Sequence, residues 1–84
     1  MADEGVRAGA TEELKRLSKA LHDICQPLTT LQCRLELAGV LGTDASYREA
    51  VEQGLVECAR LMDAVERMRE LVRAAAQRAD TAAI

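Results

Sequence analysis

The stretch LKRLSKALHDICQPLTTLQCRLELA, residues 14–38, decides the fold. Its apolar residues recur at alternating steps of three and four; they are Leu14, Leu17, Leu21, Ile24, Leu28, Leu31, Leu35 and Ala38. Such spacing over several heptads is typical of a long helix that packs in coiled-coil fashion. We therefore expect a helix from about residue 11 to about residue 40, with Thr11 as its N-cap.

A second helix is expected after the segment GVLGTDAS, residues 39–46, where Gly39 and Gly42 favour a turn. Ser46 and Glu49 fit a capping box that restarts a helix. The same apolar steps then continue through Val51, Leu55, Cys58, Met62, Val65, Met68 and Val72. The second helix should span residues 47–79, with a flexible tail at 1–10 and a frayed end at 80–84.

These two helices predict an all-α fold, an antiparallel helical hairpin over residues 11–79. Each helix would be roughly 45 Å long, and a lone pair of such thin rods cannot bury the whole apolar pattern. Small domains often gain stability by oligomerisation. We therefore expect two hairpins to associate as a homodimeric four-helix bundle.

Composition narrows the function. The chain has 84 residues and a net charge of −3, with both signs mixed along it and Tyr47 as its one aromatic residue, so it offers neither a basic surface nor stacking rings for nucleic acid. No apolar run reaches the roughly 18 residues of a membrane span, so we expect no membrane insertion. Three widely spaced cysteines without a signal peptide favour a reduced, cytoplasmic setting.

The segment HDICQPL, residues 22–28, places a proline inside the first helix. A proline there removes one hydrogen bond and clashes with the carbonyl of Asp23, at a cost of about 3 kcal/mol. The apolar steps continue in register through Pro27, which predicts a kinked rather than an ended helix. A real break between two shorter helices is the alternative.

His22 occupies a position beside the apolar pattern, facing solvent. Residues three or four apart share a helix face, which groups His22 with Lys15, Lys19, Gln26 and Thr29 or Thr30 in one polar stripe. A neutral imidazole is a competent nucleophile near pH 7, and nearby lysines would attract an anionic donor. The plain alternative is that a single exposed histidine has no role.

The pattern His22-Asp23-x-x-Gln26-Pro27-Leu28 resembles the H-box of sensor histidine kinases, which lies in their dimerisation and histidine phosphotransfer domain. That family carries a histidine, an acidic neighbour, a polar residue four positions on and then Pro-Leu, on the first of two antiparallel helices. The resemblance covers the hairpin but depends on the first helix. Gln26 stands where Thr or Asn is more common in the family.

The resemblance implies that His22 accepts a phosphoryl group and that Asp23 assists as a general base or orients the ring. Gln26 would contact the phosphoryl group or a hydrolytic water, and the kink at Pro27, next to Leu28, would give the histidine mobility. Adjacent helical residues point about 100° apart, so Asp23 cannot face His22 in an ideal helix without side-chain reach or the distortion from Pro27.

The resemblance also implies partners. The chain contains no Gly-rich phosphate loop, so we expect it to bind no cofactor itself and ATP-Mg to be held by a kinase catalytic domain, in trans or elsewhere in a longer kinase. The chain would then be the phosphoacceptor module of a transferase. A response-regulator receiver domain is expected to dock below the histidine, on a surface that includes Lys19, Thr29, Thr30, Cys33 and Arg34.

Three other interpretations stay open. The chain would be a non-catalytic homodimeric coiled coil or scaffold if His22 were incidental, and replacing His22 would then change nothing. A monomeric phosphotransfer bundle normally needs four helices in one chain, and this chain supplies two. His22 and Cys25 share a helix face, and a dimer would duplicate them into four metal ligands, but we assign no metal site.

Overall fold

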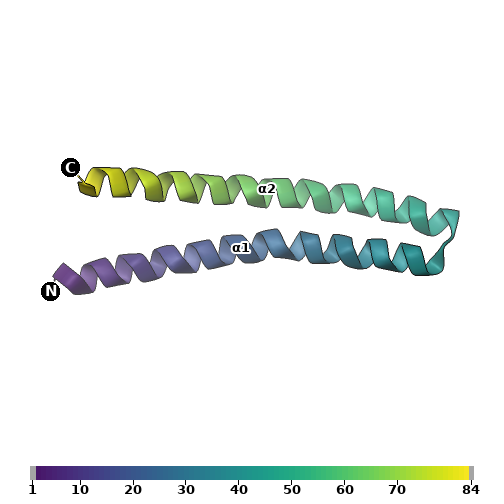
Figure 1. Ribbon diagram of the computed structural model, residues 1–84, viewed down its shortest axis with the longest axis horizontal. Helices are drawn as coiled ribbons and strands as arrows, with labels where there is room; N and C mark the ends of the chain where they lie inside the picture. Colours follow the sequence, from purple (N-terminus) through teal and green to yellow (C-terminus); the bar gives the residue numbers. More distant parts are fainter. Residues whose placement is uncertain (1, 84) are drawn as a thin grey trace.

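Two long helices form an antiparallel hairpin in the computed structural model, which describes the backbone of residues 2–83 and the side chains of residues 9–81. Helix α1 spans Ala2–Leu41 and helix α2 spans Asp44–Ala83. The hairpin measures 63 × 20 × 13 Å, and both chain termini lie at the same end (Figure 1). The predicted helical hairpin is therefore confirmed. Neither helix carries an apolar stretch long enough to span a membrane, over the residues described.

The turn is tighter than the sequence predicted, because only Gly42 and Thr43 separate the helices. Gly42 adopts a positive φ of 63° and donates its N–H to the carbonyl of Ala38 at 2.8 Å, which ends α1 in a left-handed cap. Thr43, not Ser46, is the N-cap of α2. The Ser46 N–H donates to Thr43 Oγ1 at 3.0 Å, and the Thr43 N–H donates to Ser46 Oγ at 3.1 Å.

Both helices also extend beyond their expected outer ends. Helix α1 begins at Ala2 rather than near Thr11, so the expected tail at 1–10 is helical from residue 2. Alanine and glutamate in this segment favour a helix, and its two glycines cost only about 1 kcal/mol each. Helix α2 continues to Ala83 rather than about 79. An ion pair between Glu13 and Arg78 joins the two helices near this end.

Helix α1 runs without interruption through Pro27, which rules out a break into two shorter helices. Figure 1 shows a gentle bow in the middle of α1. Two residues beyond the proline, Thr29 Oγ1 donates to the carbonyl of Cys25 at 2.9 Å. Such a bond from a side chain to the preceding turn often accompanies a bend in a helix.

The interface inside the hairpin is built on small side chains. Its buried apolar residues are Ala20, Pro27, Ala38, Ala50, Gly54 and Ala64, with larger residues such as Leu17, Ile24, Leu31 and Leu61 half-buried beside them. The helices approach so closely that a Cβ on Gly54 would lie 3.1 Å from Leu31 Cδ1. Small residues therefore set the spacing of the two helices.

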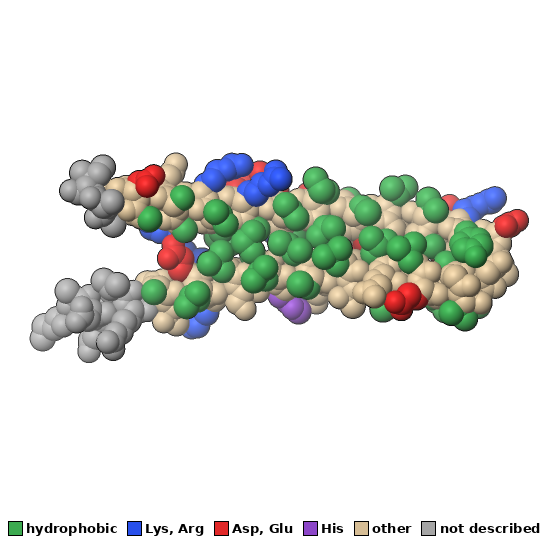
Figure 2. All heavy atoms as spheres, viewed as in Figure 1, with side chains coloured by type: hydrophobic (Ala, Val, Ile, Leu, Met, Phe, Trp, Pro, Cys, Tyr) green, Lys and Arg blue, Asp and Glu red, His purple; other side chains and the backbone are tan. Residues whose placement is uncertain are grey.

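The predicted apolar pattern consequently splits between two faces. Alternate members in α1 pack towards α2, while the others are exposed to solvent. Figure 2 shows hydrophobic side chains gathered in a band over both helices on one side of the hairpin. We call this band the apolar face; it consists of Leu14, Leu21, Leu28, Leu35, Val51, Leu55, Cys58, Met62 and Val72.

Candidate functional site

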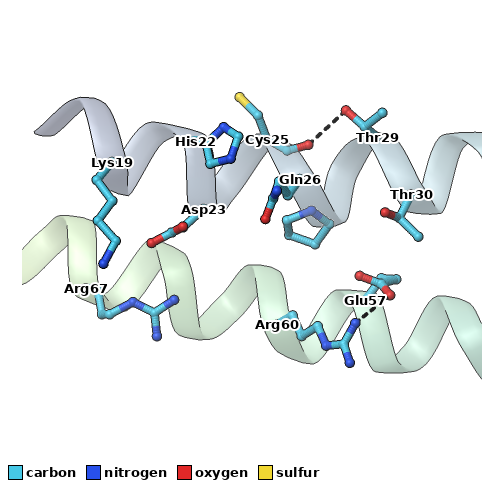
Figure 3. Close-up of a pocket in the computed structure, with 11 residues that line it drawn as sticks. Lys19, His22, Asp23, Cys25, Gln26, Thr29, Thr30, Glu57, Arg60 and Arg67 are labelled. Carbon is cyan, nitrogen blue, oxygen red and sulfur yellow. Dashed lines mark hydrogen bonds and ion pairs between the residues drawn. The ribbon is translucent and has the colours of Figure 1, made fainter.

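A groove of about 900 Å³ lies between the helices along residues 19–30 of α1, which include the HDICQPL segment (Figure 3). Both helices line it, with Lys19, His22, Asp23, Cys25, Gln26, Pro27, Thr29 and Thr30 from α1 and Glu57, Arg60 and Arg67 from α2. Helix α1 runs from left to right in both views but is the lower helix in Figure 2 and the upper one in Figure 3, so the two figures show opposite sides of the hairpin. The groove is thus separate from the apolar face.

His22 is an exposed side chain, and no described residue forms a hydrogen bond or ion pair with it. Figure 2 shows its ring projecting from α1 into solvent, and the ring also borders the groove. It is the only histidine of the chain. Both ring nitrogens are therefore free to meet a reactant from solvent or from a second protein.

The side chain of Asp23 points in a different direction from that of His22. Its side chain is half-buried and extends towards α2, whereas the ring of His22 lies on α1 above it (Figure 3). This matches the divergence of about 100° between successive helical residues. Asp23 is therefore placed to act on charges inside the groove, and its expected role as a base for His22 stays a prediction.

Gln26 lies one turn beyond His22 and points into the groove, as an exposed side chain. Its amide has both donors and an acceptor to offer to a bound group. Pro27 is buried beside it and forms part of the groove wall. The structure thus brings His22, Asp23, Gln26 and Pro27 to one groove, while Leu28 belongs to the apolar face.

The expected partner-binding residues divide into two groups. Lys19, Thr29 and Thr30 line the groove. Cys33 is exposed but does not line it. Arg34 is half-buried nearer the turn and lines a separate pocket of about 70 Å³, where its Nε is buried without a hydrogen-bond partner among the described atoms.

Three groove residues were not predicted from the sequence, and all come from α2. They are Glu57, Arg60 and Arg67. Residues equally far from the turn lie opposite each other in an antiparallel hairpin, as Leu31 and Gly54 do. By the same count from the turn, residue 63 of α2 lies opposite His22. A correctly located turn would therefore have predicted that Glu57, Arg60 and Arg67 lie near His22.

Glu57 is the one charged side chain among the buried residues described, with 5% of its surface exposed. Its Oε1 accepts a hydrogen bond from Arg60 Nη1 at 3.0 Å, and Figure 3 shows this pair below Thr30. The Arg60 side chain itself is 68% exposed. A buried carboxylate thus anchors an arginine whose remaining donors face the groove and solvent.

The groove carries more positive than negative charge, because Lys19, Arg60 and Arg67 face two carboxylates, Asp23 and Glu57. No three His, Cys, Asp or Glu side chains among the described residues converge on a common metal position. An imidazole beside clustered cations suits an anionic reactant better than a metal ion.

The chain was also compared with protein-family models, curated proteins and solved structures. None of them matches it. The assignment of function therefore depends on the residues and geometry described above.

Proposed function

We propose that this chain is the dimerisation and phosphoacceptor module of a two-component histidine kinase or of a phosphorelay. In this account His22 accepts a phosphoryl group from ATP and passes it to an aspartate of a response-regulator receiver domain. The observation that carries the proposal is the free, exposed imidazole of His22 within the segment HDICQPL, on a continuous helix of a two-helix hairpin.

The first transfer is a nucleophilic substitution at phosphorus. A ring nitrogen of His22 attacks the γ-phosphorus of ATP held by a catalytic domain, and the N–P bond forms as the P–O bond to ADP breaks. The proton on the other ring nitrogen leaves to a base, for which Asp23 or water is the candidate. Because the ring projects from α1 into solvent, a catalytic domain has room to approach it.

The second transfer reverses these bond changes. The receiver's aspartate attacks the phosphorus, the N–P bond breaks and the imidazole takes back a proton. Thr29 and Thr30 lie about two turns beyond His22 and border the same groove, so they offer a polar surface to the receiver.

The apolar face supports association of two copies. Its four leucines in α1 are 46–66% exposed in the single hairpin. These leucines span about 32 Å of α1 at 1.5 Å per residue, and the hairpin is 20 Å wide. Two paired faces would therefore bury roughly 1,300 Å², which lies within the range of about 1,200–2,000 Å² for stable protein interfaces. Pairing two hairpins there gives a four-helix bundle and leaves the groove of each copy open.

The test is labelling from ATP that carries a radioactive γ-phosphate. The wild-type chain, His22→Gln and the control Ser18→Ala are each incubated with histidine-kinase catalytic domains and Mg²⁺. We expect acid-labile, base-stable label on the wild type and on Ser18→Ala and none on His22→Gln, because a phosphoramidate bond has that stability.

Two outcomes would contradict the proposal. Label that survives in His22→Gln places the phosphate on another residue. Absence of label on the wild type, with catalytic domains that label their own acceptor domains, favours the non-catalytic homodimer in which His22 is incidental.

A further inference from the structure

We propose that the groove beside His22 is a phosphate-binding site to which α2 contributes Arg60 and Arg67 and α1 contributes Lys19. The ligand is a tetrahedral phosphate oxyanion, and the proposed function identifies it as the phosphoryl group that His22 receives. The inference therefore rests on that function for the identity of the anion, but phosphate binding itself is measurable without it.

Unpaired positive charge is the first argument. Lys19 extends from α1 towards Arg67 on α2 across the groove (Figure 3). Neither cation forms an ion pair with any described carboxylate, whereas several other cations of the hairpin do. Two like charges that face one groove repel each other, and a bound anion between them removes that repulsion.

The Glu57–Arg60 pair is the second argument. Glu57 lies in the buried interface and engages only one nitrogen of Arg60, at 3.0 Å. Arginine carries five N–H donors in a planar fork, so most of them stay available to phosphate oxygens. Glu57 thus acts as a positioning residue that holds Arg60 at the groove.

The chemistry of the proposed transfer explains why such a site is useful. Phosphoryl transfer depends mainly on positioning and on stabilising charge on the phosphoryl oxygens. Helix α1 supplies the nucleophile but only one groove cation, Lys19. The two arginines of α2 would add positive charge along the groove that holds the phosphoryl group, so both helices of one hairpin are needed for the site.

Binding of inorganic phosphate at low ionic strength tests the inference. Side-chain NMR signals of the arginines and of His22 are followed during a phosphate titration, for the wild type, Lys19→Gln, Arg67→Gln and the control Arg48→Gln. Arg48 is an exposed arginine of α2 that does not line the groove. We expect each groove variant to weaken binding about tenfold, as loss of one charge-assisted hydrogen bond does, and the control to bind as the wild type does.

A double-mutant cycle tests the positioning role of Glu57. If Glu57 acts through Arg60, Glu57→Gln weakens phosphate binding in the wild type but has no effect in an Arg60→Gln background. Equal effects in both backgrounds overturn the positioning role. Circular dichroism checks that each variant keeps its helical content.

The two proposals fail separately. Phosphate binding that persists in His22→Gln supports the site even when His22 takes no label. The wild type takes label normally in a second case, and the groove variants bind phosphate and take label as the wild type does. That result overturns only the phosphate site. The site is also overturned when the wild type does not bind phosphate or when Arg48→Gln weakens binding as much as Arg67→Gln.

Discussion

Pro27 shows at the scale of one residue how the motif tolerates a helix-breaking side chain. It is buried against α2, and α1 continues through it. The carbonyl of Asp23 loses the backbone donor that another residue at 27 would supply. Pro27 therefore destabilises α1 five residues after His22, and its ring forms part of the groove wall.

Replacing this proline should stabilise the protein. Pro27→Ala recovers about 3 kcal/mol of helix stability and loses about 1.6 kcal/mol for two buried methylene groups. We expect the free energy of unfolding to rise by about 1 kcal/mol, measured by urea titration at one fixed protein concentration. The exposed neighbour Gln26→Ala serves as control and should change it by less than about 0.5 kcal/mol.

A fall in stability for Pro27→Ala would contradict this reasoning. It would mean that packing of the ring against α2 outweighs the lost hydrogen bond.

The candidate site was predictable only in part at this scale. The spacing of His22, Asp23 and Gln26 located the reactive helix face from the sequence, and the divergence of Asp23 from His22 followed from helical geometry. Glu57 and Arg60 were not predicted. Their place in the groove depends on the register between two helices, which no local pattern in α2 encodes.

At the scale of the elements, periodicity predicted both helices, but their ends depended on caps. The bonds between Thr43 and Ser46 and the left-handed Gly42 shorten the turn to two residues. The sequence pattern of Ser46 and Glu49 had placed the start of this helix three residues later than the observed N-cap, Thr43. The shift matters because the turn sets which residues of α2 face His22.

The periodic pattern also did not show which face of each helix packs inside the hairpin and which faces solvent. Large apolar residues marked the pattern in the sequence, yet the most buried apolar side chains are alanines such as Ala64, and a Cβ on Gly54 would crowd Leu31. In α2 most of the expected apolar positions are exposed. Leu55 and Met62, for example, are 67% and 66% exposed. Hydrophobic spacing therefore located the outer apolar face better than the inner interface.

At the scale of the whole molecule, the apolar face should hold two hairpins together. We predict that Leu21→Asp, in the middle of this face, shifts the protein from dimer to monomer, because each copy would bury an unpaired carboxylate in the interface. Light scattering coupled to size-exclusion chromatography measures the mass. Leu37→Asp is a matched control, since Leu37 is similarly exposed, at 58% against 54%, but lies outside the apolar face.

The control should remain dimeric. A wild-type chain that is monomeric at micromolar concentration, or equal dissociation of both variants, would refute pairing through the apolar face.

Onward transfer of the phosphoryl group tests the central claim most directly. The chain is labelled by a catalytic domain, separated from ATP and mixed with receiver domains and with receivers whose acceptor aspartate is replaced by asparagine. We predict that label leaves the wild-type chain and reaches only intact receivers, while His22→Gln delivers none. Equal delivery by the wild type and by His22→Gln would contradict a relay through His22.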